Sequence, residues 1–167
     1  MKRNRSLALA TTALAIAAIS FGADISTLGV SVGPEASFTA VDATTSMTKA
    51  DTAFGAYTGT TNFTYKIRTT QSGGSGSITV IVTSFSGTGG PAIADLAYTC
   101  TAPASGSPCA SSTAASTSTA SSVVSFGADA HSADTGDTGA TVWTLADQPQ
   151  IKTGTYTSTA TYTISAT

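Results

Sequence analysis

Residues 154–167, the last fourteen of the chain, read GTYTSTATYTISAT. The even positions from Tyr156 to Ile164 carry aromatic, small and aliphatic side chains, whereas the odd positions carry threonine or serine. Because side chains alternate between the two faces of a strand, this order gives one apolar face and one row of hydroxyl groups. Threonine is also β-branched and favours extended backbone. The stretch therefore predicts a long C-terminal β-strand with one buried face.

The rest of the chain, from residue 27 onward, consists of shorter alternating segments that are separated by turn residues. Clusters of glycine, serine and proline, such as residues 71–76 and 87–91, are typical of turns between strands. Residues 78–85 are apolar on both faces through their middle, which favours a central place in a sheet. Further strands are predicted at residues 28–32, 36–41, 62–70, 94–100, 122–126 and 141–147.

This series of seven to nine short strands, without a helical period after the N-terminal region, predicts an all-β fold. We expect an immunoglobulin-like antiparallel β-sandwich, with a closed barrel as the alternative. Trp143 lies in phase with Leu145 on one face of its strand and is predicted to be a core residue. Residues 110–122 are almost entirely alanine, serine and threonine, and we interpret them as a loop or a low-complexity link.

The N-terminal residues have the order of a secretory signal peptide. Basic residues at positions 2, 3 and 5 precede an apolar stretch over residues 7–19, and the small residues Ser20 and Gly22 follow it. The 13-residue apolar stretch is shorter than the about 20 residues that span a bilayer. We therefore predict a signal peptide at residues 1–22 and one domain at residues 23–167, exported to the medium or the cell surface without insertion into a membrane.

Composition sets limits on the partners of this protein. Without residues 1–22, four basic residues remain against nine acidic ones, a net charge of −5. A sparse acidic surface argues against binding to nucleic acid or to an anionic membrane. Roughly a third of these residues are serine or threonine, an excess over ordinary globular proteins. The surface is thus polar mainly through hydroxyl groups.

Cys100 and Cys109 are the only cysteines. An even number of cysteines in an exported chain predicts a disulfide. The eight residues between them include two prolines and a glycine, so the bond would close a small local loop. Such a loop contributes about 2–3 kcal/mol in the loop-entropy model. We interpret the pair as a structural disulfide and not as a redox motif.

The sequence contains little that supports catalysis, and we predict a protein that is not an enzyme. His131 is the single histidine, in the segment DAHSAD, and no Gly-x-Ser-x-Gly motif is present. A catalytic triad is defined by geometry, so a histidine near serine and aspartate in the sequence is weak evidence. We interpret His131 as a solvated loop residue.

An acidic loop at residues 127–139 is the one candidate metal site. Asp129, Asp134 and Asp137 lie within nine residues, with glycines at positions 136 and 139. Carboxylates on a flexible loop suit Ca²⁺, which takes six to eight oxygen ligands. The spacing differs from that of an EF-hand, and the alternative is a solvated acidic turn. A bound Ca²⁺ would brace this loop.

Two further motifs suggest a function but also have simpler interpretations. The threonine row of residues 155–165 resembles the rows of ice-binding proteins, but a single row is more simply a solvent-facing strand surface. The Asn62-Phe-Thr64 triplet is a formal glycosylation sequon at the start of a predicted strand, and such short motifs also arise by chance.

The C-terminal stretch from Gly154 to Ile164 resembles the last strand of secreted bacterial immunoglobulin-like surface proteins, including spore-coat-U-like proteins and chaperone–usher pilin subunits. Those subunits end in a glycine followed by an alternating strand that pairs with a chaperone and then with the next subunit. The resemblance also implies that residues 23–32 are similar to a donor strand, with alternate apolar side chains. The same residues would otherwise be the first strand of this protein's own sandwich.

These observations together predict an exported structural or surface protein, such as a filament, pilus or coat subunit, that assembles with itself or with related subunits. Its mechanism would be the addition of a β-strand, in which backbone hydrogen bonds give affinity and alternate side chains give register. The residues expected to carry this assembly are Leu28, Val30, Val32, Tyr156, Ala160, Tyr162 and Ile164. The alternative is an extracellular module that binds a glycan or Ca²⁺ through residues 127–139.

Overall fold

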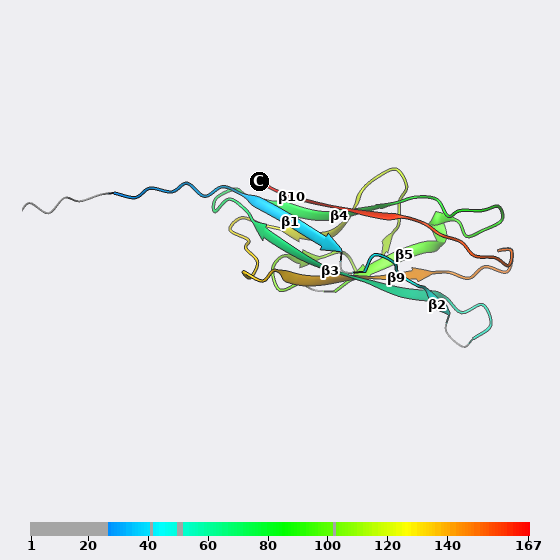
Figure 1. Cartoon of the computed structure of the whole chain (residues 1–167). Helices are drawn as coiled ribbons and strands as arrows, with labels where there is room; N and C mark the ends of the chain where they lie inside the picture. The colour runs from blue at the N-terminus through cyan, green and yellow to red at the C-terminus, as the bar shows by residue number, and fades with distance from the viewer. Residues whose placement is uncertain (1–26, 41, 50–51, 102) are drawn as a thin grey trace, which may run out of the picture. The chain divides into compact units, whose positions relative to one another are not determined.

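The computed structural model of this chain describes residues 27–40, 42–49, 52–101 and 103–167 (Figure 1). The chain divides into two units, Met1–Ser31 and Val32–Thr167. In the first unit, residues 27–31 form neither helix nor strand, and every strand of the described residues belongs to the second. The predicted signal peptide and its cleavage site lie outside the described residues. Within the described ranges, no helix is long and apolar enough to cross a membrane.

The second unit is built from two antiparallel sheets, as the sequence predicts. In the six-stranded sheet the order is β1-β3-β9-β5-β7, and β2 also pairs with β3. Its strands are β1 (Glu35–Ala40), β2 (Thr48–Lys49), β3 (Tyr57–Arg68), β5 (Leu96–Cys100), β7 (Thr113–Ala114) and β9 (Asp137–Leu145). The four-stranded sheet has the order β10-β4-β8-β6 and consists of β4 (Gly76–Val82), β6 (Ser107–Pro108), β8 (Ser121–Phe126) and β10 (Ala160–Ala166). A 3-10 turn, η1 (Ile93–Asp95), precedes β5.

The core lies between the two sheets, where alternate residues of facing strands meet. On β3, Phe63, Tyr65 and Ile67 are buried and their neighbours in sequence are not, as the period of two requires. The strand β4 lies in the middle of its sheet, as its apolar composition predicts. Trp143 is also buried, which confirms its assignment to the core. The remaining core residues are Ile78, Val80, Val82, Leu96, Tyr98, Val123, Val124, Phe126 and Leu145.

The strand order places elements that are consecutive in the chain in different sheets. Here β9 lies between β3 and β5, whereas β10 lies beside β4 in the other sheet. From β3 onward, every connection between consecutive strands crosses from one sheet to the other. Alternation in the sequence shows which face of a strand is buried, but it does not show which strand becomes its neighbour.

The ends of several strands also differ from the sequence prediction. The strand β10 begins at Ala160 and not near residue 154, although the residues before it still form hydrogen bonds with residues 83–86. There Thr83 N–H donates to Thr159 O at 2.9 Å and Ser86 N–H donates to Thr157 O at 2.8 Å. The expected strand at residues 28–32 does not form. The strand β9 begins at Asp137, inside the predicted acidic loop.

Candidate functional site

One side of the sandwich is closed by the disulfide between Cys100 and Cys109, which the sequence predicts. Cys100 is the last residue of β5 in the six-stranded sheet. Cys109 N–H donates to Val123 O of β8 at 2.9 Å, which places Cys109 at the edge of the four-stranded sheet. The bond therefore ties the two sheets together covalently. The short strands β7 and β6 pair with β5 and β8 on the same side.

The opposite side of the sandwich is formed by β1 and β10, and we call it the open side. Each of these strands has a hydrogen-bonded neighbour on one edge alone among the described residues. They lie beside each other and run in opposite directions (Figure 1). The rings of Phe38 and Tyr162 stack across this side, with centroids 5.4 Å apart and an interplanar angle of 17°. Both rings also contact Phe63.

The outer edge of β10 carries backbone groups that are unpaired within the part of the chain that the structure describes. Thr167 N–H donates to Ser75 O at 2.8 Å, and Thr159 O accepts from Thr83, so the odd-numbered residues of this stretch face β4. Because consecutive residues of a strand point their backbone groups to opposite edges, the even-numbered residues face outward. These residues are Ala160, Tyr162, Ile164 and Ala166. Their N–H and C=O groups are available to another strand.

The outer edge of β1 has the same character over a shorter length. Ile67 O of β3 accepts from Ser132 N–H at 3.0 Å, so Ile67 points its backbone groups away from β1. The next residue, Arg68, points toward β1, where its partner in the ladder is Glu35. By alternation, Ala36 and Phe38 direct their N–H and C=O groups away from β3. Both residues also pack their side chains against the core.

The β10 edge lacks the features that usually protect a free strand. Exposed edges in native proteins are commonly guarded by lysine, proline or a bulge. The outward side chains of β10 are Thr161, Thr163 and Ser165, all exposed, and the strand contains no charged residue and no proline. Its pairing with β4 runs in regular register from end to end. The edge of β1, in contrast, begins at Glu35, which forms a 3.1 Å ion pair with Arg68.

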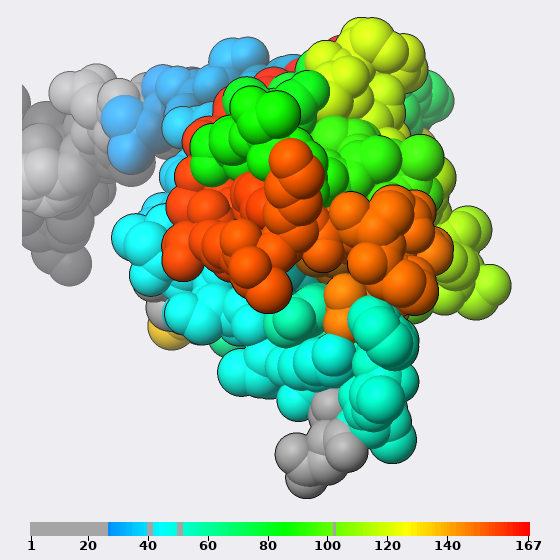
Figure 2. All heavy atoms as spheres, turned by 90° about the vertical axis from the view of Figure 1, so that its right-hand side faces the viewer, coloured from blue at the N-terminus to red at the C-terminus, as the bar shows by residue number. Residues whose placement is uncertain are grey.

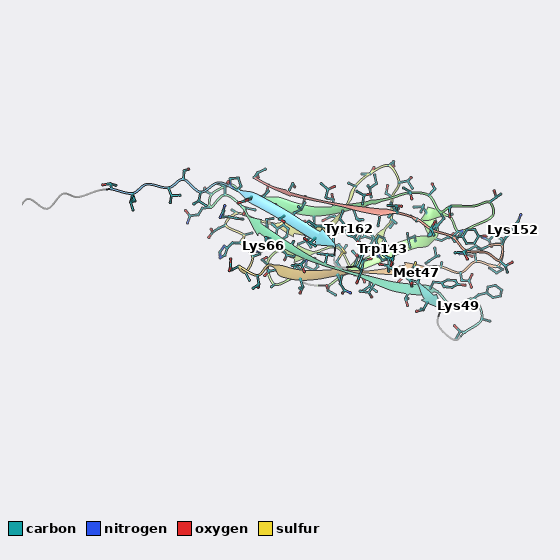
Figure 3. The ribbon with its side chains drawn as sticks, viewed as in Figure 1. Met47, Lys49, Lys66, Trp143, Lys152 and Tyr162 are labelled. Carbon is teal, nitrogen blue, oxygen red and sulfur yellow. A yellow bond between two sulfur atoms is a disulfide. The ribbon has the colours of Figure 1, made fainter. Side chains whose placement is uncertain are left out.

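A buried hydrogen-bond network holds β10 against the core. The Tyr162 hydroxyl bonds to the Thr141 hydroxyl, and Thr141 is completely buried. Next to this pair, Trp143 Nε1–H donates to Thr61 Oγ1 at 3.0 Å. Figure 3 labels Tyr162 and the neighbouring Trp143. Burial raises the pKa of Tyr162, because the phenolate would lose its hydration. Thr61 and Thr141 are not predicted from the sequence, although each lies in phase with a buried aromatic residue of its own strand.

The acidic loop does not gather its carboxylates. Asp137 is buried, with 8% of its surface exposed, and accepts hydrogen bonds from Ser105 Oγ–H at 2.6 Å and Ala133 N–H at 3.1 Å. Asp129 and Asp134 are exposed. Within the described ranges, no group of three His, Cys, Asp or Glu side chains is placed to hold a metal ion. The bracing predicted for Ca²⁺ is thus supplied here by Asp137, which links residues 105 and 133.

His131 lies at the end of the sandwich where β1 begins. Its Nδ1 lies 2.9 Å from the carbonyl oxygen of Asp129, and its backbone forms an isolated bridge with Arg68. The neighbouring Ser132 Oγ accepts a hydrogen bond from Ile67 N–H at 3.1 Å and so has a structural role. A shallow hollow of about 290 Å³ is lined by Lys66, Arg68 and His131 together with Ser132 and Asp134. In the described part of the chain, His131 makes no side-chain contact of the catalytic-triad kind.

Tyr156, one of the residues predicted for assembly, lies outside the strand. Its hydroxyl donates to Lys152 O at 2.9 Å, and its ring rests on the glycine-rich 87–90 loop. A Cβ atom at Gly90 would come within 2.5 Å of this ring, so the close approach requires glycine there. Figure 2 shows this end of the sandwich, where the loops before β5 and before β10 lie side by side. Tyr156 therefore anchors a loop.

The structure brings together three of the seven residues predicted for assembly. Ala160, Tyr162 and Ile164 lie in a row on β10. The other candidates, Leu28, Val30 and Val32, are exposed and belong to no strand. Comparisons with known proteins found no matching family model, no matching curated protein and no matching solved structure.

Proposed function

We propose that this protein is an exported structural subunit of a filament, pilus or coat, which assembles when its open side takes up a β-strand from another subunit. The observation that carries the proposal is the pair of strand edges, β1 and β10, that have no partner among the described residues and lie on one side of the sandwich. The opposite side is closed by the disulfide and by two short strands. An unprotected edge is a template for pairing with another chain, so a charge-free β10 suits a subunit that assembles.

The side chains of the open side support the same proposal. Phe38, Tyr162 and Ile164 are only half-buried, so an added strand would cover apolar surface that water now reaches. Such a strand needs alternate apolar side chains, one face of which packs on these residues. The segment that contains Leu28, Val30 and Val32 has this pattern and is exposed. It is our candidate for the strand that one copy supplies to another.

Export is the second part of the proposal. The N-terminal residues have the order of a signal peptide, and a structural disulfide is stable in an oxidising compartment. Mass spectrometry and N-terminal sequencing of the protein recovered outside the cytoplasm test this part. A chain that begins at Ala23 is the expected result. A full-length chain that is retained in the cytoplasm would contradict export.

The assembly is tested by light scattering and negative-stain electron microscopy of the purified exported protein. Ladders that resist SDS, or filaments, are expected. A variant with Leu28, Val30 and Val32 replaced by serine tests the candidate donor segment, and a variant with Thr27 and Ser31 replaced by alanine is the matched control. Loss of long assemblies in the first variant alone supports the donor role. A wild-type protein that stays monomeric at all concentrations contradicts the proposed function.

A further inference from the structure

The β10 edge is complementary to itself. We propose that two copies of the chain pair through their β10 strands, antiparallel and about a two-fold axis at Thr163, so that two four-stranded sheets become one sheet of eight strands. This inference rests on the proposed function, because it names the partner of the β10 edge. A two-fold axis requires that the same surface patch of each subunit serves both sides of the interface.

The unpaired backbone groups select the register. They belong to the even-numbered residues, so hydrogen bonds form only when even residues lie opposite even residues. Pairing Tyr162 with Ile164 of the partner subunit also pairs Ala160 with Ala166 of the partner subunit. In this register all seven residues of β10 have a partner and Thr163 meets its own copy. A shift of two residues would leave two residues of each strand without a partner.

The side chains agree with this register on both faces. On the inner face, Tyr162 lies opposite Ile164 of the partner subunit, an aromatic and β-branched pair of the kind that stabilises sheets. On the outer face, Thr161 lies opposite Ser165 of the partner subunit, so hydroxyl groups face hydroxyl groups. In a symmetric pair, a charge near the axis would face its own copy. The absence of charge from β10 is therefore what self-pairing requires.

The other strand edges are less suited to this role. The outer edges of β5 and β8 are partly covered by β7 and β6. The strand β1 is free, but it carries the charged Glu35 and follows directly after Pro34. Its six residues offer fewer outward backbone groups than the seven of β10. The β10 edge is the longest uncharged one, which leaves the β1 edge for another strand.

Single cysteine substitutions test the register. In the proposed pair, the two copies of residue 163 form a non-hydrogen-bonded pair with Cα atoms about 4.5 Å apart, within the range that a disulfide spans. Thr163→Cys should therefore give a covalent dimer under mild oxidation. Thr161→Cys and Ser165→Cys are matched controls on the same exposed face. Each copy of residue 161 lies ~13 Å along the strand from its counterpart, so neither control should cross-link alone.

A mixture of Thr161→Cys and Ser165→Cys should cross-link, because these two positions lie opposite each other in the same register. A non-reducing gel reads all four samples, and peptide mapping of the dimer band shows which cysteines are joined. Thr163→Lys provides an independent reading, since it places two like charges face to face and should weaken the dimer in light scattering. Circular dichroism confirms that each variant remains folded.

The outcomes separate this inference from the proposed function. Protein that assembles without a link at position 163 overturns the two-fold pairing but leaves strand addition at another edge. Equal cross-linking of all three single-cysteine variants also overturns it, because contact would then lack a register. A dimer that is linked at position 163 but does not assemble into anything larger supports the pairing and contradicts the proposed filament subunit. Protein that is monomeric throughout contradicts both.

Discussion

Phe38 on β1 and Tyr162 on β10 stack their rings across the open side with centroids 5.4 Å apart. This contact joins the two sheets where no covalent bond does, whereas the Cys100–Cys109 bond joins them on the opposite side. The sandwich therefore has one side that is held by a disulfide and one that is held by side-chain packing. Under the proposed function, this asymmetry makes the open side the place where another strand binds.

The ring contact can be measured by substitution of Phe38. Phe38→Ala removes the stacking with Tyr162 and with Phe63, and we expect a loss of about 2–3 kcal/mol in the free energy of unfolding. The value lies below the about 3–5 kcal/mol that is typical of a buried phenylalanine, because the side chain is half-buried. Urea denaturation of Phe38→Ala and of the exposed control Thr39→Ala gives the comparison. An equal effect of both substitutions would show that the ring contact contributes little.

Tyr162 makes the stability sensitive to alkaline pH. Burial raises its pKa in the folded protein, so the folded state holds the phenol proton more tightly than the unfolded chain does. The resulting stabilisation is complete below the unfolded pKa of about 10 and is lost as the pH rises through the folded pKa. We expect the melting temperature to fall above that pH. Tyr162→Phe should reduce this fall, although Tyr65 and Tyr98, whose pKa values are also raised by burial, still contribute.

The same substitution has a cost at neutral pH. Tyr162→Phe leaves the buried Thr141 hydroxyl without its partner, which should destabilise the protein by about 1–2 kcal/mol at pH 7. The double variant Tyr162→Phe with Thr141→Val removes both polar groups and should recover part of that loss. Thermal unfolding of the two variants provides the test. No recovery in the double variant would contradict the hydrogen bond as the cause.

Asp137 is expected to stabilise the fold through its hydrogen bonds. Asp137→Asn weakens the charge-assisted bond from Ser105 and the bond from Ala133, and should cost about 1.5–3 kcal/mol. The exposed neighbour Asp134 is the matched control, since Asp134→Asn should change the stability by less than about 0.5 kcal/mol. Denaturant midpoints of the two variants measure the difference. Similar midpoints would mean that the buried carboxylate has no structural role.

Removal of the disulfide should affect stability without affecting assembly. Replacement of Cys100 and Cys109 by serine opens a short loop and should cost about 2–3 kcal/mol. The bond lies on the side opposite β1 and β10, so the variant without the disulfide should, once folded, assemble as the wild type does. Thermal unfolding and light scattering measure the two effects separately. Assembly that is lost while the variant is still folded would place the interface on the disulfide side.

Much of the local structure could be predicted from the sequence because strand faces follow a period of two. The alternation in residues 63–67 identifies which side chains of β3 are buried, and the same argument assigns Trp143 to the core. The cysteine count predicts the disulfide. Each of these inferences uses residues that are close in sequence, where geometry is set by the chain itself.

The burial of Thr61 and Thr141 shows where such local reasoning ends. A threonine is compatible with either face of a strand, and its hydroxyl is tolerated in the core only where a partner is present. The partner of Thr61 is Trp143, which becomes available when β9 pairs with β3. The partner of Thr141 is Tyr162, which becomes available when β10 packs across from β9. The sequence shows which face of its strand each threonine occupies, but it does not show which side chain that threonine contacts.

The sequence by itself therefore determined that this protein is made of strands with one apolar face, and that its two cysteines are joined. Tertiary structure alone decided that β9 enters the six-stranded sheet, that β10 pairs with β4, and that the β1 and β10 edges have no partner in residues 27–40, 42–49, 52–101 and 103–167. The reason is that a strand's face depends on a two-residue period within the strand. Its neighbours depend on contacts between residues far apart in the chain, which compete with one another when the sheets pack.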